Sequence, residues 1–228
     1  MGQLLLVRHG QASFGAADYD VLSETGWAQG RALGEHLRLA GIRPTALVRG
    51  TMRRHRETLE AIAETADWSF DDVLIDAGWD EFDHVALVGS LPDLPAGDLD
   101  RRTFQQYFEK ATAAWTAGTH EGAGETYAGF LERVSGAMAG AVALAGSGAT
   151  VVVVTSGGPI AALAAGLVDP EGTADAETGQ ATRARLWSRF NTVVVNAAIT
   201  RVVAGSTGAR LLTFNEHPHL AGDLLTYR

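Results

Sequence analysis

The chain has 228 residues, of which 46% are hydrophobic and 20% charged, so it can bury a full core and suits one domain of ordinary or slightly large size. Its formal net charge of −9 argues against binding to nucleic acid or to an anionic membrane, because such partners call for a basic surface. The absence of cysteine excludes disulfides and thiolate metal sites. The first apolar stretch is too short for a signal sequence or a membrane span, so we expect a cytoplasmic protein.

Short apolar runs predict the strands of a sheet. Residues 4–7 and 151–154 form continuous aliphatic runs bounded by polar residues or glycine. This pattern is typical of central strands in a parallel sheet that is covered on both faces. Weaker strand candidates lie at 46–48, 73–75, 192–199 and 210–214.

Helical patterns separate the strand candidates. The first spans 25–40, with Ser23 as its cap and Gly41 as its stop. Gly26 and Gly30 weaken this helix but permit close packing on the sheet. Further helices are predicted from Met52 to Ala66, over 127–146 and from Gly158 and Pro159 onward, whereas 171–180 is predicted to be a loop.

Alternating strands and helices indicate an α/β fold, a three-layer α/β/α arrangement with a mostly parallel central sheet. We expect a single domain over residues 1–228. The alternation fails at about 85–124, where a loop-like stretch is followed by a helical one with no strand nearby. We predict a small helical cap insertion there, over one end of the sheet.

Charged side chains follow the first strand at the edge where open α/β sheets bind ligands. Arg8, His9 and Gly10 stand there. The arginine is a forked, permanently charged donor for phosphate or carboxylate, and the histidine suits a nucleophile or a base. Taken alone, this tripeptide fits a solvated pair at a strand end about as well as it fits a site.

In the basic run after the second strand, Arg54 has no acidic residue four positions on. Arg53 and Arg56 have Glu57 and Glu60 four positions on, as in pairs on a solvated helix face. Arg54 lies beside the buried stripe near the helix start, where the backbone N–H groups and the helix dipole also favour an anion. We therefore expect Arg54, rather than its neighbours, to face a ligand.

Acidic residues follow the third strand. Asp80, Glu81, Asp83 and His84 come just after Trp79. A carboxyl group against an aromatic wall can have a raised pKa that suits a general acid. The alternative is a polar loop with structural hydrogen bonds, which accounts for most of these four residues.

In their order along the chain, these segments resemble the histidine phosphatase superfamily, which includes the phosphoglycerate mutase-like enzymes. The resemblance rests on LLLVRHGQAS, LSETGWAQGRALGEHL, the helix start at 54–58, WDEFDH, GETYAGFLERV and VVVVTSGGPIAAL. It covers nearly the whole chain, and its specificity comes from the order of the motifs. It implies a phosphatase that acts through a phosphohistidine intermediate on a small phosphorylated substrate, without a cofactor or a metal.

By this resemblance His9 is the nucleophile, Arg8 and Arg54 hold the phosphoryl oxygens, and Glu81 protonates the leaving oxygen. Such a set suits phosphoryl transfer, which needs mainly positioning and positive charge around the transferred group. The family usually has a second histidine at the glycine turn after the fourth strand. Ser156 stands at that position.

Ser156 is expected to act as a neutral hydroxyl donor to the phosphate, with Gly157 keeping the backbone close. The loss of the second histidine implies weaker activity or a replacement group. His84 is the candidate for that replacement, followed by His217 and His219.

The predicted cap and the segment after the first motif bear on the class of substrate. The predicted cap holds few basic residues, Arg101, Arg102 and Lys110 among them, so it offers no clear patch for a densely anionic substrate. Residues 13–26 also lack the Trp-Asn pair that follows the first motif in cofactor-dependent mutases. Both points favour a phosphatase over a mutase.

Three other interpretations stay open. A serine hydrolase would use Ser156 as nucleophile with Asp175 and His217, although Val154 replaces the first glycine of the usual elbow. A phospho-ligand-binding or regulatory module would keep the fold after losing a catalytic group. A metal site on His217 and His219 is the weakest interpretation, because two histidines around one proline are common on surfaces.

Overall fold

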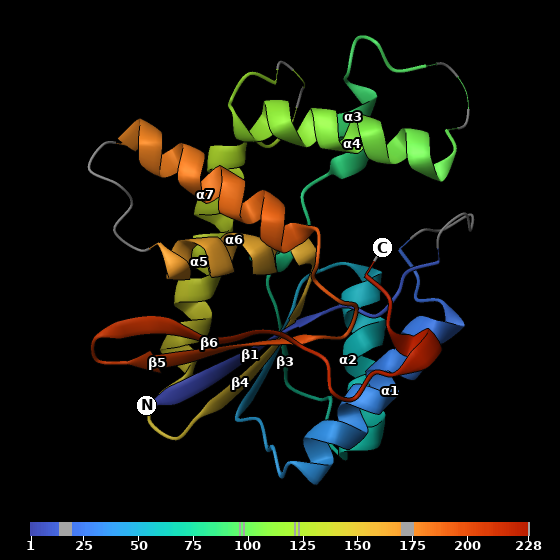
Figure 1. The fold of residues 1–228 in the computed structure, drawn as a ribbon. Coiled ribbons are helices and arrows are strands. Elements are labelled where there is room, and N and C mark those ends of the chain that lie inside the picture. The colour runs from blue at the N-terminus through green and yellow to red at the C-terminus, as the bar shows by residue number, and fades with distance from the viewer. Residues whose placement is uncertain are drawn as a thin grey trace.

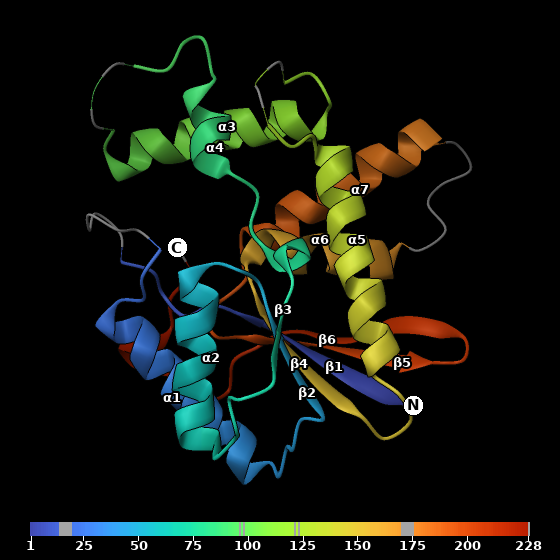
Figure 2. The ribbon, with the colours of Figure 1, turned by 180° about the vertical axis from the view of Figure 1, so that it is seen from behind.

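The structure is a computed structural model, and it describes residues 1–13, 20–95, 97, 99–120, 122, 124–169 and 176–227. Figures 1 and 2 show a central sheet with helices on both faces and further helices beyond one end of it. This is the α/β/α arrangement predicted from the alternation of strands and helices. Within the described ranges, no helix is long and apolar enough to cross a membrane.

The described residues form a six-stranded sheet with the order β3-β2-β4-β1-β5-β6. Its strands are β1 (Gly2–Arg8), β2 (Ala46–Arg49), β3 (Val73–Ile75), β4 (Thr150–Thr155), β5 (Ile199–Gly205) and β6 (Gly208–Glu216). Neighbouring strands from β3 to β1 run parallel, and β5 is antiparallel to both of its neighbours. The two continuous aliphatic runs form β1 and β4, which pair at the centre of the sheet.

Helices cover both faces of the sheet. α1 (Glu24–Leu39) and α2 (Arg53–Ala66) lie on one face, and α5 (Tyr127–Leu144), α6 (Gly157–Val168) and α7 (Ala176–Asn191) lie on the other (Figure 1). The predicted cap consists of α3 (His84–Gly89) and α4 (Arg101–Thr116), which pack on each other beyond the carboxyl ends of the parallel strands. The 3₁₀ turn η1 (Ala77–Trp79) lies between β3 and α3, and the 3₁₀ turn η2 (Gly222–Leu224) follows β6.

Alternate side chains of β1 enter two separate cores. Leu4 and Leu6 pack under α5, α6 and α7, whereas Leu5 and Val7 pack under α1 and α2. All four are fully buried, and burial of such a side chain contributes roughly 1.5–3 kcal/mol. Because both faces of the strand are covered, a continuous aliphatic run fits where an alternating one would not. This packing fixes the strand end from which the candidate site residues project.

Gly30 brings α1 close to α2, and Gly26 brings it close to the segment that follows β1. The expected close packing at Gly26 and Gly30 is present, but the predicted partner was wrong. A Cβ on Gly30 would lie 2.6 Å from the Cβ of Ala61 in α2, and a Cβ on Gly26 would lie 2.2 Å from the carbonyl oxygen of Gln11. Ser23 caps α1 as predicted, by accepting a hydrogen bond from the N–H of Gly26.

The strand predicted at 192–199 was wrong. Residues 192–198 form an irregular segment, and β5 begins only at Ile199. Ala197 has a φ of +56° and donates its N–H to the carbonyl oxygen of Arg8. The valines of this segment include two that are buried by packing, Val194 and Val195, and β-branched residues fit such a site as well as they fit a strand.

The loop predicted at 171–180 was wrong in its second half. Residues 176–180 are the beginning of α7, and 171–175 lie outside the described residues. α7 packs on α6 and buries Trp187. Its alternation of polar and small residues carries only a weak amphipathic pattern, so the helix depends on this contact more than on its own sequence.

Candidate active site

The predicted site residues meet at a cavity of about 560 Å³ between the carboxyl ends of the strands and the cap. The lining combines polar groups from the sheet edge with aromatic groups from the cap. It includes Arg8, His9, Arg54, Glu81, His84, Gly157, Phe82, Phe104, Phe108, Asn191 and Asn196. Ser156 is fully buried directly beside this lining, at the position before Gly157.

His9 has one ring nitrogen in a hydrogen bond and the other available for chemistry. Its Nδ1 lies 2.7 Å from the carbonyl oxygen of Gly10. A carbonyl oxygen can only accept, so Nδ1 carries the proton and the lone pair of the neutral ring is on Nε2. Burial is the main reason that the pKa of His9 lies well below its usual value, and the charges of Arg54 and Arg8 act in the same direction. A neutral imidazole with its lone pair on Nε2 is the state that a nucleophile needs.

The backbone around His9 is held by three separate segments. The N–H of His9 donates to the carbonyl oxygen of Thr155 in β4, at 2.9 Å. Its own carbonyl oxygen accepts from Nδ2 of Asn196, at 3.1 Å. The N–H of Gly10 donates to Oγ1 of Thr58 in α2, also at 2.9 Å. These bonds fix the imidazole relative to the sheet and to α2.

Arg8 and Arg54 bring two guanidinium groups to the cavity from different elements. Arg54 lies in the first turn of α2, is 5% exposed, and donates from Nη1 to Oδ1 of Asp20 at 2.7 Å. Arg8 ends β1 and donates to the carbonyl oxygens of Val194 and Tyr227. Arg54 thus lines the cavity, as expected, and the structure adds an acidic partner 34 positions away in the sequence.

Arg53 and Arg56 pair with the glutamates that the sequence predicted, but Glu57 is buried rather than solvated. Nε of Arg53 lies 2.7 Å from Oε1 of Glu57, and Nε of Arg56 lies 3.6 Å from Oε1 of Glu60. Both arginine side chains are about half exposed, and neither lines the cavity. Arg54 differs from its neighbours because the side chains of successive helix positions point in different directions around the helix axis.

Glu81 is a buried carboxyl group at the cavity. Its Oε2 accepts a hydrogen bond from the N–H of Gly158, at 3.1 Å. Burial raises the pKa of Glu81, against the opposing effects of this hydrogen bond and of the two arginines. A Cβ on Gly158 would lie 2.1 Å from Oε1 of Glu81, so only glycine leaves room for the carboxyl group. A carboxyl group with a raised pKa is suited to donating a proton near neutral pH.

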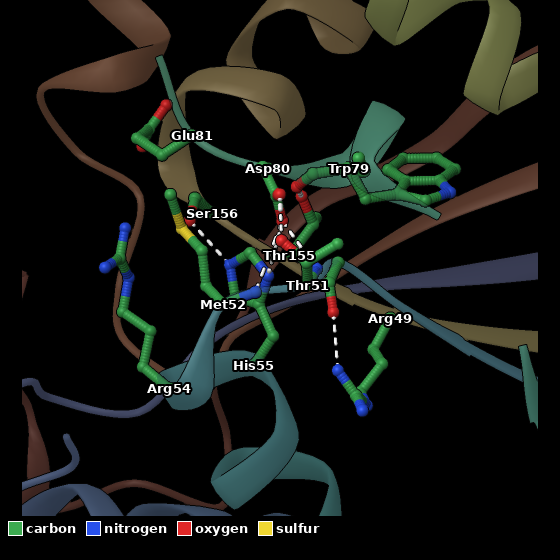
Figure 3. Close-up of polar contacts among 12 residues, drawn as sticks. Arg49, Thr51, Met52, Arg54, His55, Trp79, Asp80, Glu81, Thr155 and Ser156 are labelled. Carbon is green, nitrogen blue, oxygen red and sulfur yellow. Dashed lines mark hydrogen bonds and ion pairs between the residues drawn. The ribbon is translucent and has the colours of Figure 1, made fainter. Parts of the chain in front are cut away.

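Ser156 contacts His55 of α2, a residue that was not among the predicted site residues. Its Oγ lies 2.7 Å from Nε2 of His55 (Figure 3), and both residues are fully buried. The ring centre of His55 is 5.8 Å from that of His9. On the other side of the ring, Nδ1 lies 3.6 Å from Oδ1 of Asp80. A histidine in a buried stripe next to Arg54 was the signal in the sequence, and its meaning depended on this contact.

His84, the predicted replacement for the second histidine, lines the cap side of the cavity. It is the first residue of α3. Its ring meets those of Phe82 and Phe108 edge-on, with ring centres 6.3 Å apart in both cases. Burial lowers the pKa of His84, so the ring is neutral near neutral pH and contributes to the aromatic wall.

The remaining histidine candidates lie outside the cavity lining. Nδ1 of His217 lies 2.6 Å from the carbonyl oxygen of Asn215, and Nε2 of His219 lies 3.0 Å from that of Ala197. Each ring therefore donates to the backbone. Asp175, which the serine hydrolase interpretation requires, lies outside the described residues. In the part of the chain that is described, no group of three or more His, Cys, Asp or Glu side chains is arranged to hold a metal ion.

Comparison with known proteins places this site in a family. Residues 4–217 match the profile described as histidine phosphatase superfamily (branch 1). The chain belongs to this superfamily. The resemblance drawn from the order of the motifs is thereby confirmed. A comparison of the chain with curated proteins gave no match.

Solved structures share the fold of this superfamily member over nearly their full length. YhfR of Bacillus stearothermophilus is 19% identical, with 95% of this chain and 98% of that chain covered and a TM-score of 0.68. A mycobacterial glucosyl-3-phosphoglycerate phosphatase is 24% identical, with coverage of 94% and 99% and a TM-score of 0.63. A mutant phosphoserine phosphatase of Entamoeba histolytica, in complex with phosphoserine, is 18% identical, with coverage of 97% and 100% and a TM-score of 0.65. At these identities the likeness establishes the fold.

Three residues at the site were not predicted from the sequence. Asp20 pairs with Arg54, Asn196 holds the carbonyl of His9, and His55 contacts Ser156. The partners are 34, 187 and 101 positions apart, respectively. No local pattern marks such contacts.

Proposed function

We propose that this chain is a phosphomonoesterase that forms a phosphohistidine intermediate on His9. The observation that carries the proposal is the state of the His9 ring, whose Nδ1–H is donated to Gly10 and whose Nε2 lone pair is left for bond formation, at a cavity that two arginines line. Membership of the superfamily supports it. So do the phosphatase activities that name two of its structural relatives.

In the first step, Nε2 of His9 bonds to phosphorus while the bond between phosphorus and the ester oxygen breaks. Arg8 and Arg54 hold the phosphoryl oxygens, over which negative charge is spread in the transition state. Glu81, whose pKa is raised by burial, gives a proton to the ester oxygen from its protonated form. The alcohol therefore leaves as a neutral molecule.

In the second step, a water molecule attacks the phosphorus of the phosphohistidine. Glu81, now a carboxylate, accepts one proton from the water. The bond between phosphorus and Nε2 of His9 breaks, and its electron pair returns to the ring. Inorganic phosphate leaves, Glu81 is again protonated, and one water molecule has been consumed.

The cavity lining supports a substrate with one phosphoryl group and an apolar or aromatic leaving group. Phe82, Phe104 and Phe108 supply the aromatic wall. Among the described lining residues, Arg8 and Arg54 are the lysine or arginine side chains. Two guanidinium groups suffice for one phosphoryl group, whereas a bisphosphate carrier would need further cations. This balance supports hydrolysis over mutase chemistry.

The basic residues of the cap do not change this balance. Lys110 forms an ion pair with Asp93, and Arg102 is exposed on α4. Neither lines the cavity, and the side chain of Arg101 lies outside what the structure describes. The proposed substrate is therefore recognised by its phosphate and by the aromatic wall.

A phospho-ligand-binding module is the second candidate, because serine stands at the position of the family's second histidine. Such a module would bind phosphate at Arg8 and Arg54 without turnover. Hydrolysis of p-nitrophenyl phosphate separates the two candidates, because only the phosphatase releases nitrophenol.

The proposed function is tested with wild-type protein, His9→Ala and the control His217→Ala, which removes a histidine outside the cavity lining. We expect His9→Ala to abolish turnover of p-nitrophenyl phosphate and His217→Ala to retain it. Protein denatured rapidly during turnover of a radiolabelled phosphomonoester should carry an acid-labile label, which His9→Ala should lack. Undiminished kcat in folded His9→Ala, or an acid-stable label, contradicts the proposal.

A further inference from the structure

A chain of polar groups runs beside His9, and the mechanism above leaves it unused. It passes from Thr51 through Asp80 and His55 to Ser156 (Figure 3). Asp80 accepts hydrogen bonds from the N–H of Thr51, at 2.7 Å, and from its hydroxyl group. Oδ1 of Asp80 lies 3.6 Å from Nδ1 of His55, and Nε2 of His55 lies 2.7 Å from Oγ of Ser156. The chain ends at the turn where the superfamily usually has its second histidine.

The fold makes room for this chain at a specific place. A Cβ on Gly50 would lie 2.3 Å from Nδ1 of His55 and 2.4 Å from Oδ1 of Asp80. The residue after β2 must therefore be glycine for the imidazole and the carboxylate to stand together. Burial lowers the pKa of His55, and the nearby Asp80 opposes this shift. A fully buried histidine is an unusual residue in the apolar stripe of a helix.

We infer that His55 is a positioning residue that takes the part of the superfamily's second histidine by acting through the hydroxyl group of Ser156. The inference rests on the proposed phosphatase mechanism. Ser156 immediately precedes Gly157, which lines the cavity, and the ring of His55 stands 5.8 Å from that of His9. Two residues from α2 and the β4–α6 turn together supply the phosphate donor that the family takes from one residue.

The proton positions follow from the two ends of the chain. The carboxylate of Asp80 favours a proton on Nδ1 of His55, so in the ligand-free protein the hydroxyl group of Ser156 donates to Nε2. A phosphate ester that binds as a monoanion can transfer its proton to His55. Nε2–H then donates to Oγ of Ser156, and the hydroxyl group donates to a phosphoryl oxygen. A hydrogen bond to a charged phosphoryl group is stronger than one between neutral groups.

The charged groups around His55 set the pH range of this arrangement. Asp80 and Asp20 favour the protonated ring, and Arg54 from the same helix disfavours it. His9 faces the ring from the end of β1. Because the protonated ring is the active state, the part of kcat that depends on His55 falls as pH rises through its pKa in the substrate complex. Glu81 titrates separately, as the general acid.

A double-mutant cycle tests the inference in the full chain, with p-nitrophenyl phosphate as the probe. His55→Ala and Ser156→Ala should each lower kcat by about 10- to 100-fold, which is the contribution of one hydrogen bond to a charged group. The double variant should lose no more than either single variant, because both changes remove the same donor. A merely structural His55 would instead give independent, additive losses.

A reciprocal exchange sharpens the test. Ser156→His alone should not gain activity, because His55 already occupies the space beside Oγ. His55→Ala combined with Ser156→His returns the imidazole to position 156, and its kcat should exceed that of His55→Ala by about 10-fold or more. No recovery in a folded double variant contradicts the proposed exchange of positions.

His55→Gln keeps a side-chain donor without a titratable ring, and it covers the case in which His55→Ala does not fold. We expect it to retain more activity than His55→Ala. We also expect the pH profile of its kcat to lose the titration of His55. A wild-type kcat and an unchanged pH profile in His55→Gln overturn the inference. If His9→Ala still loses turnover in that case, the proposed function is unaffected. An acid-stable phosphoenzyme on Ser156 overturns both, since His55 and Asp80 would then activate a serine nucleophile.

Discussion

Replacing Arg54 with alanine should lower kcat/KM for p-nitrophenyl phosphate by about 100- to 1,000-fold. This corresponds to about 3–4 kcal/mol, the loss that follows removal of one preorganised donor to a transition-state oxyanion. The guanidinium group of Arg54 lines the cavity and is only 5% exposed, so solvent screens its charge weakly. Its distance of 2.7 Å from Asp20 holds the side chain in place before a substrate binds.

The same substitution should cost little stability. Asp20 loses its ion pair with Arg54, but its side chain is 37% exposed and water can solvate the carboxylate. We expect a change of about 1 kcal/mol or less in the free energy of unfolding, as for other partly exposed pairs. Urea denaturation of the variant measures this quantity and separates a catalytic loss from an unfolded fraction.

Arg56→Ala is the matched control on the same helix. Arg56 is 48% exposed, and its Nε lies 3.6 Å from Glu60. We expect kcat/KM to change by less than about twofold, because removal of an exposed pair is worth about 1 kcal/mol or less and affects only stability. Both variants are compared with wild type by steady-state kinetics at one pH and one ionic strength. Similar losses in Arg54→Ala and Arg56→Ala would refute the assignment of Arg54 to the phosphoryl group.

Glu81→Gln should lower kcat more for an alkyl phosphate than for p-nitrophenyl phosphate, because nitrophenolate leaves without a proton; equal losses would argue against the general acid. Since burial raises the pKa of Glu81, the wild-type rate for the alkyl ester should fall as pH rises through that pKa, and the variant should lack this limb. Phe108→Ala should raise KM for aryl phosphates by about 2- to 10-fold without changing inhibition by inorganic phosphate, and a rise in both would show a wider disturbance. Burial lowers the pKa of His219 from 6.5 to about 4. Between these two pH values the unfolded chain binds more protons than the folded chain. The free energy of unfolding should therefore decrease as pH falls through this window, by at most about 3 kcal/mol. His219→Gln should flatten that dependence in urea denaturation, and parallel curves for variant and wild type would contradict it.

The central strands and the place of the site could be predicted from the sequence because local patterns determine them. The short aliphatic runs of β1 and β4 are typical of strands covered on both faces. Parallel strands bring their carboxyl ends to one edge, so the sequence alone predicted that Arg8, His9 and Arg54 lie close together. The order of the motifs also identified the superfamily, because this order reflects which residues follow each strand.

The segment before β5 shows where local patterns fail. Its valines predicted a strand, but Ala197 adopts a left-handed conformation there, and Asn196 is turned toward the carbonyl of His9. Burial of Val194 and Val195 explains the composition without any sheet pairing. A run of β-branched residues indicates that a segment is buried. Whether its backbone is extended depends on the elements that pack against it.

The sequence by itself determined the α/β order of elements, the superfamily and the histidine at the end of β1. Only the tertiary structure decided that Ser156 meets His55 rather than His84, and that Asp20 holds Arg54. Residues of one strand or helix reveal their direction through a period of two or 3.6 residues. A hydrogen bond between elements 101 positions apart has no period, because it depends on how α2 packs beside β4 and on the space that Gly50 leaves between them.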